Sequence, residues 1–163
     1  MSLRAGAIKK TTLCFVFDEI NNSLLMIHKK RGQGAGKWNV PGGKMQEDET
    51  PEAAAIRETK EETGITPSNL QYAGKLEFYF PAGNSWDNIC EVFTANQFSG
   101  QLITDGEECS ASWVSLDKIP LEKMWDSDKR WLPLLLSRKK FHCSYTFDAN
   151  DNVTHEKIEK AED

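Results

Sequence analysis

The chain of 163 residues has 25 acidic and 20 basic side chains, a formal net charge of −5, and is 39% hydrophobic and 28% charged. This length and composition predict one globular domain over residues 1–163. The acidic balance gives no basic footprint for a nucleic-acid polymer, and no apolar run reaches the roughly 20 residues of a membrane span. The N-terminal segment lacks the apolar core of a signal peptide, so we expect a cytoplasmic protein without a membrane partner.

Two apolar strands are predicted first, in residues 11–32, where an Asn-rich turn joins them into a hairpin. A glycine-rich loop follows in "RGQGAGKWNVPGGK", residues 31–44. Its spacing fits neither the G-x-x-x-x-G-K-[ST] nor the G-x-G-x-x-G pattern of phosphate-binding loops. We therefore do not interpret this loop as a phosphate cradle of either kind.

A helix is predicted next, with Thr50 as its N-cap, Pro51 at its first position and Gly64 as its C-cap. Further segments follow: strands in residues 70–80 and 88–98 around a turn in 81–87, a strand in 109–120, a helix in 128–140 begun or interrupted near Pro133, and a hairpin in 142–158 around Asn150–Asn152. This order of strands and helices predicts an α+β fold, a mixed sheet flanked by helices.

The first predicted helix carries an unusual concentration of acid. Glu58, Glu61 and Glu62 fall within roughly 100° of one another around its axis. Carboxylates at this spacing repel one another, so the face is either only solvated, with Arg57 and Lys60 as partners, or it holds a cation. Oxygen ligands of this kind suit Mg²⁺.

The acidic helix and the loop before it satisfy the pattern G-x5-E-x7-R-E-x-x-E-E-x-G through Gly43, Glu49, Arg57, Glu58, Glu61, Glu62 and Gly64. This segment resembles the catalytic box of the Nudix hydrolases, with Thr59 where the family has an aliphatic residue. The resemblance implies an α/β/α sandwich with a mixed β-sheet. It also implies Mg²⁺ as the cofactor, with Mn²⁺ as an alternative, and attack of water on a phosphorus of a nucleoside diphosphate linked to another group.

The resemblance also assigns roles within and near the box. Metal ligands would be the Gly42 carbonyl, Glu58, Glu61, Glu62 and Glu108. Arg57 would orient a carboxylate, either Glu49 or Glu61, without touching substrate. The general base is left open between Glu61, Glu62 and Glu108.

Three segments outside the box, "KKRGQGAGKWNVPGGK", "LDKIPLEKMW" and "RWLPLLLSRKKFH", resemble the Nudix members that hydrolyse oxidised purine nucleoside triphosphates. The likeness covers about residues 10–150. It implies that Asn39 meets the base edge, that Trp125 stacks on the purine and that Trp131 lies either at the pocket or in the core. The implied nucleotide pocket comprises Thr12, Lys29, Asn39, Pro41, Gly42, Gly43, Lys44, Phe78, Trp125, Asp126, Ser127, Asp128 and Trp131.

Two segments depart from that group of enzymes at three positions. In the run "WDSD", Asp126 replaces a Pro, Ser127 replaces the first of two adjacent Asp residues, and Asp128 aligns with the second. Gln33 replaces a Phe, so one apolar wall becomes polar. We therefore expect purine recognition, with a discrimination between bases that the sequence does not specify.

The resemblance implies a Mg²⁺-dependent pyrophosphohydrolase that converts 8-oxo-dGTP, or a related purine nucleoside triphosphate, to the monophosphate and pyrophosphate. Such an enzyme removes damaged nucleotides from the nucleotide pool. Its partner would be a small-molecule nucleotide substrate, and the protein would be a monomer. One alternative is a different nucleoside diphosphate derivative: a dinucleoside polyphosphate, a sugar nucleotide or capped RNA. The other is a non-catalytic Nudix-fold module, which the presence of Glu49, Glu58, Glu61 and Glu62 disfavours.

Overall fold

The fold is that of a computed structural model, which describes residues 8–81 and 86–160. Its strands and helices follow the order β1 (Lys9–Asp18), β2 (Ser23–Lys29), β3 (Trp38–Asn39), β4 (Gly42–Lys44), α1 (Pro51–Thr63), β5 (Ile65–Ser68), β6 (Gln71–Tyr79), β7 (Asn88–Ala95), β8 (Gln97–Gly100), β9 (Cys109–Ser115), α2 (Asp128–Leu136), β10 (Phe141–Phe147) and β11 (Val153–Lys160). Two short 3-10 helices, Leu116–Lys118 and Leu121–Lys123, lead into α2.

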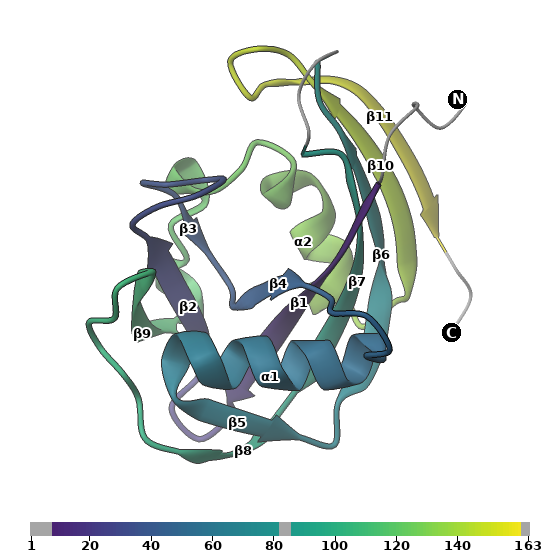
Figure 1. The fold of residues 1–163 in the computed structure, drawn as a ribbon. Coiled ribbons are helices and arrows are strands. Elements are labelled where there is room, and N and C mark those ends of the chain that lie inside the picture. The colour runs from purple at the N-terminus through teal and green to yellow at the C-terminus, as the bar shows by residue number, and fades with distance from the viewer. Residues whose placement is uncertain (1–7, 82–85, 161–163) are drawn as a thin grey trace.

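The main sheet is mixed and curved (Figure 1). Its strand order is β11-β10-β6-β7-β1-β2-β3, with β4 paired to β1 and β9 paired to β2. The β1–β7 and β6–β10 pairs are parallel, whereas the other pairs of this sheet are antiparallel. Strands β5 and β8 form a separate antiparallel pair beside α1.

The two helices cover opposite faces of this sheet. Successive side chains of a strand point to opposite faces, and the core clusters divide β1 accordingly. Phe15 packs in one cluster with Trp131 of α2, while Cys14 and Val16 pack in another with Ala55 of α1. The α+β class and the α/β/α layering predicted from the sequence are therefore confirmed.

The first predicted helix is confirmed with both caps. The Thr50 side chain accepts a hydrogen bond from the Ala53 N–H at 3.1 Å. At the other end, Gly64 adopts a left-handed conformation (φ 80°) and its N–H donates to the Lys60 carbonyl at 2.9 Å. The second helix, α2, begins at Asp128 and continues through Pro133 rather than starting there.

The structure differs from the prediction in three segments. The glycine-rich loop contains two short strands, because β3 pairs with β2 and β4 pairs with β1. The strand expected in residues 88–98 is two strands, β7 and β8, in different sheets. Strand β5 was not predicted; it accepts Pro67 because it pairs on one side only. Of the turn expected in residues 81–87, positions 82–85 lie outside the described residues.

No helix in the described part of the chain is both long and apolar enough to cross a membrane.

Candidate active site

Arg57, in the middle of α1, organises the acidic residues of the box. Its guanidinium donates to both carboxylate oxygens of Glu49, from Nε at 2.7 Å and from Nη2 at 3.0 Å. The same group donates to Glu58 at 2.9 Å, to Glu61 at 3.3 Å and to the Lys44 carbonyl at 3.0 Å. All these partners are protein atoms, so Arg57 orients carboxylates rather than facing the cavity.

The strip at Gly42 and Gly43 joins the box to β1. Gly42 pairs with Leu13, and its N–H donates to Glu62 Oε1 at 2.8 Å. A Cβ on Gly42 would lie 2.0 Å from the Thr12 carbonyl oxygen, and a Cβ on Gly43 would lie 2.6 Å from the Glu58 carboxylate. The backbone of β1 therefore requires glycine at position 42, whereas a side chain at position 43 would displace the Glu58 carboxylate.

The carboxylates of the box differ in protonation tendency. Hydrogen bonds from Arg57 lower the pKa of Glu49 to about 2. Burial raises the pKa of Glu58, against the opposing effect of Arg57. Burial also raises the pKa of Glu62 to about 7, although the Gly42 N–H partly offsets it. Burial and mutual repulsion thus make the ionised forms of Glu58 and Glu62 unfavourable. A bound cation would stabilise those ionised forms.

The donor set fits a hard divalent cation. Each of Glu58, Glu61 and Glu62 uses one carboxylate oxygen in a hydrogen bond to Arg57 or Gly42, and its other oxygen makes no hydrogen bond within the described residues. Mg²⁺ needs only one or two carboxylates, because it retains several waters. Within residues 8–81 and 86–160, no three acidic, His or Cys side chains already stand close enough together to form a metal cluster.

Glu108, the remaining acidic residue assigned to the metal, lies on the loop before β9. It lines the cavity, and its carboxylate faces Arg31 Nε at 3.6 Å. The Lys30 N–H donates to the Glu108 carbonyl at 2.9 Å, which fixes this loop against the end of β2. Glu108 thus shares the lining of the cavity with Gly42 and Gly43.

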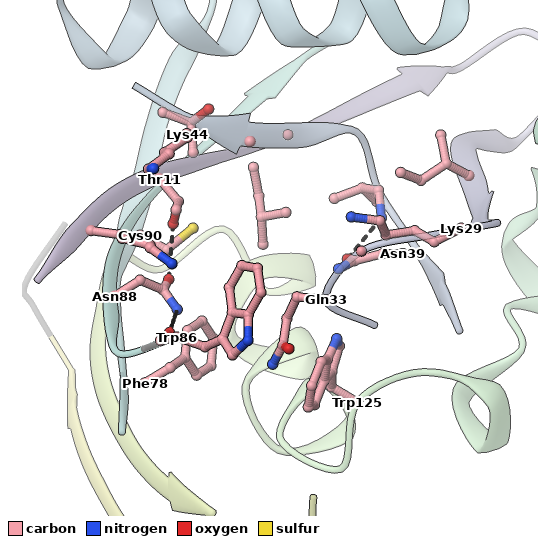
Figure 2. Close-up of a pocket in the computed structure, with 18 of the residues that line it drawn as sticks. Thr11, Lys29, Gln33, Asn39, Lys44, Phe78, Trp86, Asn88, Cys90 and Trp125 are labelled. Carbon is pink, nitrogen blue, oxygen red and sulfur yellow. Dashed lines mark hydrogen bonds between the residues drawn. The ribbon is translucent and has the colours of Figure 1, made fainter. Parts of the chain in front are cut away.

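A cavity of about 490 Å³ opens beside the box (Figure 2). It lies between β1, the glycine-rich loop, the β6–β7 end of the sheet and the segment before α2. The predicted residues that line it are Thr12, Lys29, Asn39, Gly42, Gly43, Lys44, Phe78, Glu108, Trp125, Ser127 and Asp128. Residues from segments far apart in the sequence therefore meet at one cavity.

Aromatic rings form the apolar walls of this cavity. Trp125 packs edge-on against Phe80 and Phe147, with ring centroids 5.9 and 5.5 Å apart. Phe78 contacts Phe147 at 6.0 Å on the same side. Lys37 Nζ lies 5.1 Å from the centroid of Trp125. Flat, fixed rings of this kind suit the face of a heterocyclic base.

The polar groups of the cavity are poorly satisfied by the protein itself. The Thr12 and Ser127 hydroxyls are buried without a hydrogen-bond partner. Asp128 accepts from the Trp125 N–H at 3.0 Å, and its burial raises the pKa of the carboxyl to about 7. Asn39 Oδ1 accepts from the Val40 N–H at 2.8 Å, so its NH₂ group keeps its donors for the cavity. A ligand with several polar atoms would complete these groups.

Three predicted pocket residues do not line the cavity. Asp126 points away: it accepts from the Val153 N–H at 3.0 Å and faces Lys129 and Arg130. Trp131 is 1% exposed in the core, edge-on to Phe15 at 5.6 Å. Pro41 is buried, and its carbonyl accepts from the Cys14 N–H.

The structure also adds lining residues that the sequence did not indicate. Phe80 follows Phe78 by two positions and lies just beyond the end of β6, so the alternation of the strand predicted over residues 70–80 could have found it. Trp86 had no signal, because it lies in the predicted turn between strands. Asn88 begins β7, and nothing in the predicted strand pointed it to the cavity. Figure 2 shows the Trp86 indole and the Gln33 amide directed into the same space. The other added residues are Lys9, Thr11, Leu13, Ile27, Arg31, Gly32, Val40, Cys90 and Phe147.

Thr59, the departure within the box, is fully buried on α1. Its hydroxyl donates to the Ala55 carbonyl one turn earlier at 2.7 Å. The polar atom is therefore satisfied inside the helix, and the packing of α1 on the sheet is retained.

Comparison with known proteins adds four similarities. The NUDIX domain family matches residues 8–135. The chain is 38% identical to the oxidized purine nucleoside triphosphate hydrolase of Danio rerio over 140 residues, 86% of this chain and 88% of that protein. It is 39% identical to the protein of the same name from Mus musculus over 130 residues, 80% of this chain and 82% of that protein. The crystal structure of a MutT protein from Bacillus halodurans matches with a TM-score of 0.79 at 24% identity, covering 93% and 98% of the two chains.

Proposed function

Because this chain belongs to the Nudix family, we propose that it is a Mg²⁺-dependent hydrolase of purine nucleoside triphosphates, with oxidised purines such as 8-oxo-dGTP among its substrates. The products are the nucleoside monophosphate and pyrophosphate. The relatives from Danio rerio and Mus musculus bear the name of this activity and cover most of the chain.

One observation carries the proposal: the aromatic cavity and the acidic box share the strip at Gly42 and Gly43. Both glycines line the cavity, while Gly42 is bonded to Glu62 and Gly43 lies against Glu58. A base held against Trp125 would therefore place its phosphate chain across the strip toward the carboxylates. A substrate with a flat base and a polyphosphate matches both halves of this site.

Each group has a role in this proposal. Glu58, Glu61 and Glu62, with Glu108 and the Gly42 carbonyl, are the groups that would hold Mg²⁺. The metal would supply charge neutralisation at the phosphates and a more acidic water. Arg57 holds Glu49, Glu58 and Glu61 in place. Glu62, whose pKa burial raises to about 7, is suited to accept the proton of the attacking water.

At the base end, the unpartnered groups of the cavity would read the purine. The Asn39 NH₂ group is a donor, and the Thr12 and Ser127 hydroxyls can each donate or accept. Asp128 can donate when protonated and accepts when ionised. Lys29 and Lys44 line the side nearer the box and would meet the phosphate chain.

The test is release of pyrophosphate and monophosphate from a panel of normal and oxidised nucleotides with Mg²⁺. We expect turnover of 8-oxo-dGTP, dGTP or 2-hydroxy-dATP, and its loss in EDTA. Faster turnover of a dinucleoside polyphosphate, a sugar nucleotide or capped RNA would replace the proposed substrate with that compound. Absence of hydrolysis for the whole panel would instead indicate a non-catalytic module.

We further propose that the protein acts on free nucleotides in the cytoplasm as a monomer. The acidic composition supports this, since a polymer of nucleic acid needs a basic surface. Light scattering of the purified protein tests the monomer, and a dimeric mass would contradict it.

A further inference from the structure

Arg31 lies at the mouth of the cavity, and neither the box nor the base pocket uses it. Arg31 and Lys29 both line the cavity. Between them, Lys30 pairs with Asp105 and donates to the Gly106 carbonyl at 2.7 Å. Lys29 ends β2 and Arg31 lies in the bend that follows, while Lys30 is absent from the cavity lining and holds the loop at residues 105–106.

The contacts of Arg31 are weak and easily exchanged. Its guanidinium lies 3.5 Å from the Glu107 carboxylate and 3.6 Å from the Glu108 carboxylate, and Nε donates to the Glu107 carbonyl at 3.3 Å. The side chains are 57% exposed for Arg31, 91% for Glu107 and 65% for Glu108. Ion pairs this open to solvent contribute little stability, so a stronger anion can displace them.

Arg57 of the box is not available to bind an anion in the cavity, because its guanidinium donates to Glu49, Glu58, Glu61 and the Lys44 carbonyl. Among the described residues that line the cavity, the cations are Lys9, Lys29, Arg31 and Lys44. Arg31 is the one guanidinium of that set. Its planar fork can give two parallel hydrogen bonds to a phosphate, which an ammonium cannot.

We propose that Arg31 binds the phosphate chain of the substrate, exchanging the carboxylates of Glu107 and Glu108 for phosphate oxygens. The same exchange frees the Glu108 carboxylate at the moment when the polyphosphate arrives beside the box. This deepens the proposed function and depends on it only for the class of ligand, a polyphosphate. Arg31 is then a substrate-binding residue, and Glu108 serves as its counter-ion in the free protein.

The test uses inorganic tripolyphosphate, titrated by calorimetry into metal-free protein at low ionic strength. We expect the wild type to bind it, Arg31→Gln to bind about tenfold more weakly and Arg31→Lys to fall between them, because the fork is lost but the charge stays. Lys10→Gln is the matched control: it removes the same charge from an exposed side chain of β1 outside the cavity lining. Equal weakening by both variants, or no binding by the wild type, would overturn the proposal.

A double-mutant cycle tests the exchange itself. Glu108→Gln should tighten tripolyphosphate binding in the wild-type background, since Arg31 loses a competing partner. In the Arg31→Gln background that gain should be clearly smaller. A gain of the same size in both backgrounds would show that Glu108 acts only through general repulsion and would refute the exchange.

These measurements are independent of the substrate assignment. Tripolyphosphate carries no base and no bond is cleaved, so loss of binding in Arg31→Gln supports the inference whichever nucleotide is hydrolysed. Conversely, a panel without turnover would refute the proposed function and leave this binding result standing. On any nucleotide that is turned over, Arg31→Gln should raise KM more than it lowers kcat.

Discussion

The Gly42 N–H donates to Glu62 Oε1 at 2.8 Å, and this bond joins the strand that borders the cavity to the helix that carries the carboxylates. It occupies one oxygen of Glu62 and leaves the other for a ligand. The bond therefore fixes the direction of the Glu62 carboxylate while keeping it available for chemistry.

The first prediction concerns Glu62→Gln. The amide oxygen can still accept from Gly42, so the fold should persist, but the ionised oxygen is lost. Mg²⁺ binding to the folded state should raise the Tm of the wild type, and we expect this rise to shrink sharply in the variant. Turnover should fall by at least about 10²-fold.

The control is Glu52→Gln, which alters an exposed acid in the first turn of α1. It should keep both the Mg²⁺-dependent rise in Tm and the turnover. Glu62→Gln with a wild-type response to Mg²⁺ would exclude this carboxylate as a metal ligand, and unchanged turnover would exclude it as the base.

The second prediction concerns Gly43→Ala. A Cβ at Gly43 would lie 2.6 Å from the Glu58 carboxylate, which has to move by rotating its side chain. Because that movement breaks the Arg57–Glu58 contact at 2.9 Å, kcat should fall by roughly 10-fold or more, with a modest loss of stability. Steady-state kinetics and thermal unfolding measure the two effects.

Gly42→Ala provides the comparison, since its Cβ would lie 2.0 Å from the backbone oxygen of Thr12. Backbone cannot rotate away, so this variant should lose stability more than Gly43→Ala does. The reverse order of stabilities would show that the close approach of β4 to β1 is not what requires glycine.

Much of this site was predictable because its chemistry is local in the sequence. The spacing of Glu49, Arg57, Glu58 and Glu62 lies within one loop and one helix, so helical geometry and the box pattern suffice. The caps at Thr50 and Gly64 were predicted for the same reason, since capping depends on the few residues around a helix end.

What the sequence left open depends on long-range packing. Trp131 fits core and pocket equally well as a sequence position, and only the contact with Phe15 across the sheet places it in the core. Asp126 was assigned to the pocket, but the Val153 N–H, far along the chain, draws its carboxylate away. Trp86 had no local signal, because its place beside the cavity depends on the β6–β7 pairing.

The third prediction is a double-mutant cycle between Arg57 and Glu49, which are joined by two hydrogen bonds. Arg57→Lys keeps the charge but cannot form both bonds, so kcat should fall by about 10-fold or more while KM changes little. Glu49→Gln should lower kcat similarly. The double variant should be little worse than either single variant, because one interaction is being removed twice. Fully additive losses in kcat would contradict a purely orienting role for Arg57.

The last prediction is a pH dependence of stability that comes from Asp128. This carboxyl is 3% exposed, and burial raises its pKa from 3.8 to about 7. Between these values the folded protein keeps a proton that the unfolded chain releases. The free energy of unfolding should therefore fall as pH rises from about 4 to about 7, by on the order of a few kcal/mol, and level off above that.

Asp128→Asn should remove this contribution, since the amide does not titrate and can still accept from the Trp125 N–H. Urea unfolding of both proteins in EDTA, from pH 5 to pH 8, measures the difference. Glu62, whose pKa is also raised, contributes a slope of the same sign to both proteins, so the difference between them isolates Asp128. We expect the variant to gain stability relative to the wild type as pH rises toward 7.

Asp126→Asn is the control with the opposite sign. The Val153 N–H lowers the pKa of Asp126, so this carboxylate contributes stability that is present above the unfolded pKa and lost in acid. Its replacement should leave the slope between pH 5 and pH 8 unchanged. If the stability curves of Asp128→Asn and wild type ran parallel across that range, Asp128 would already be ionised in the folded protein. It would then read the base as an acceptor alone.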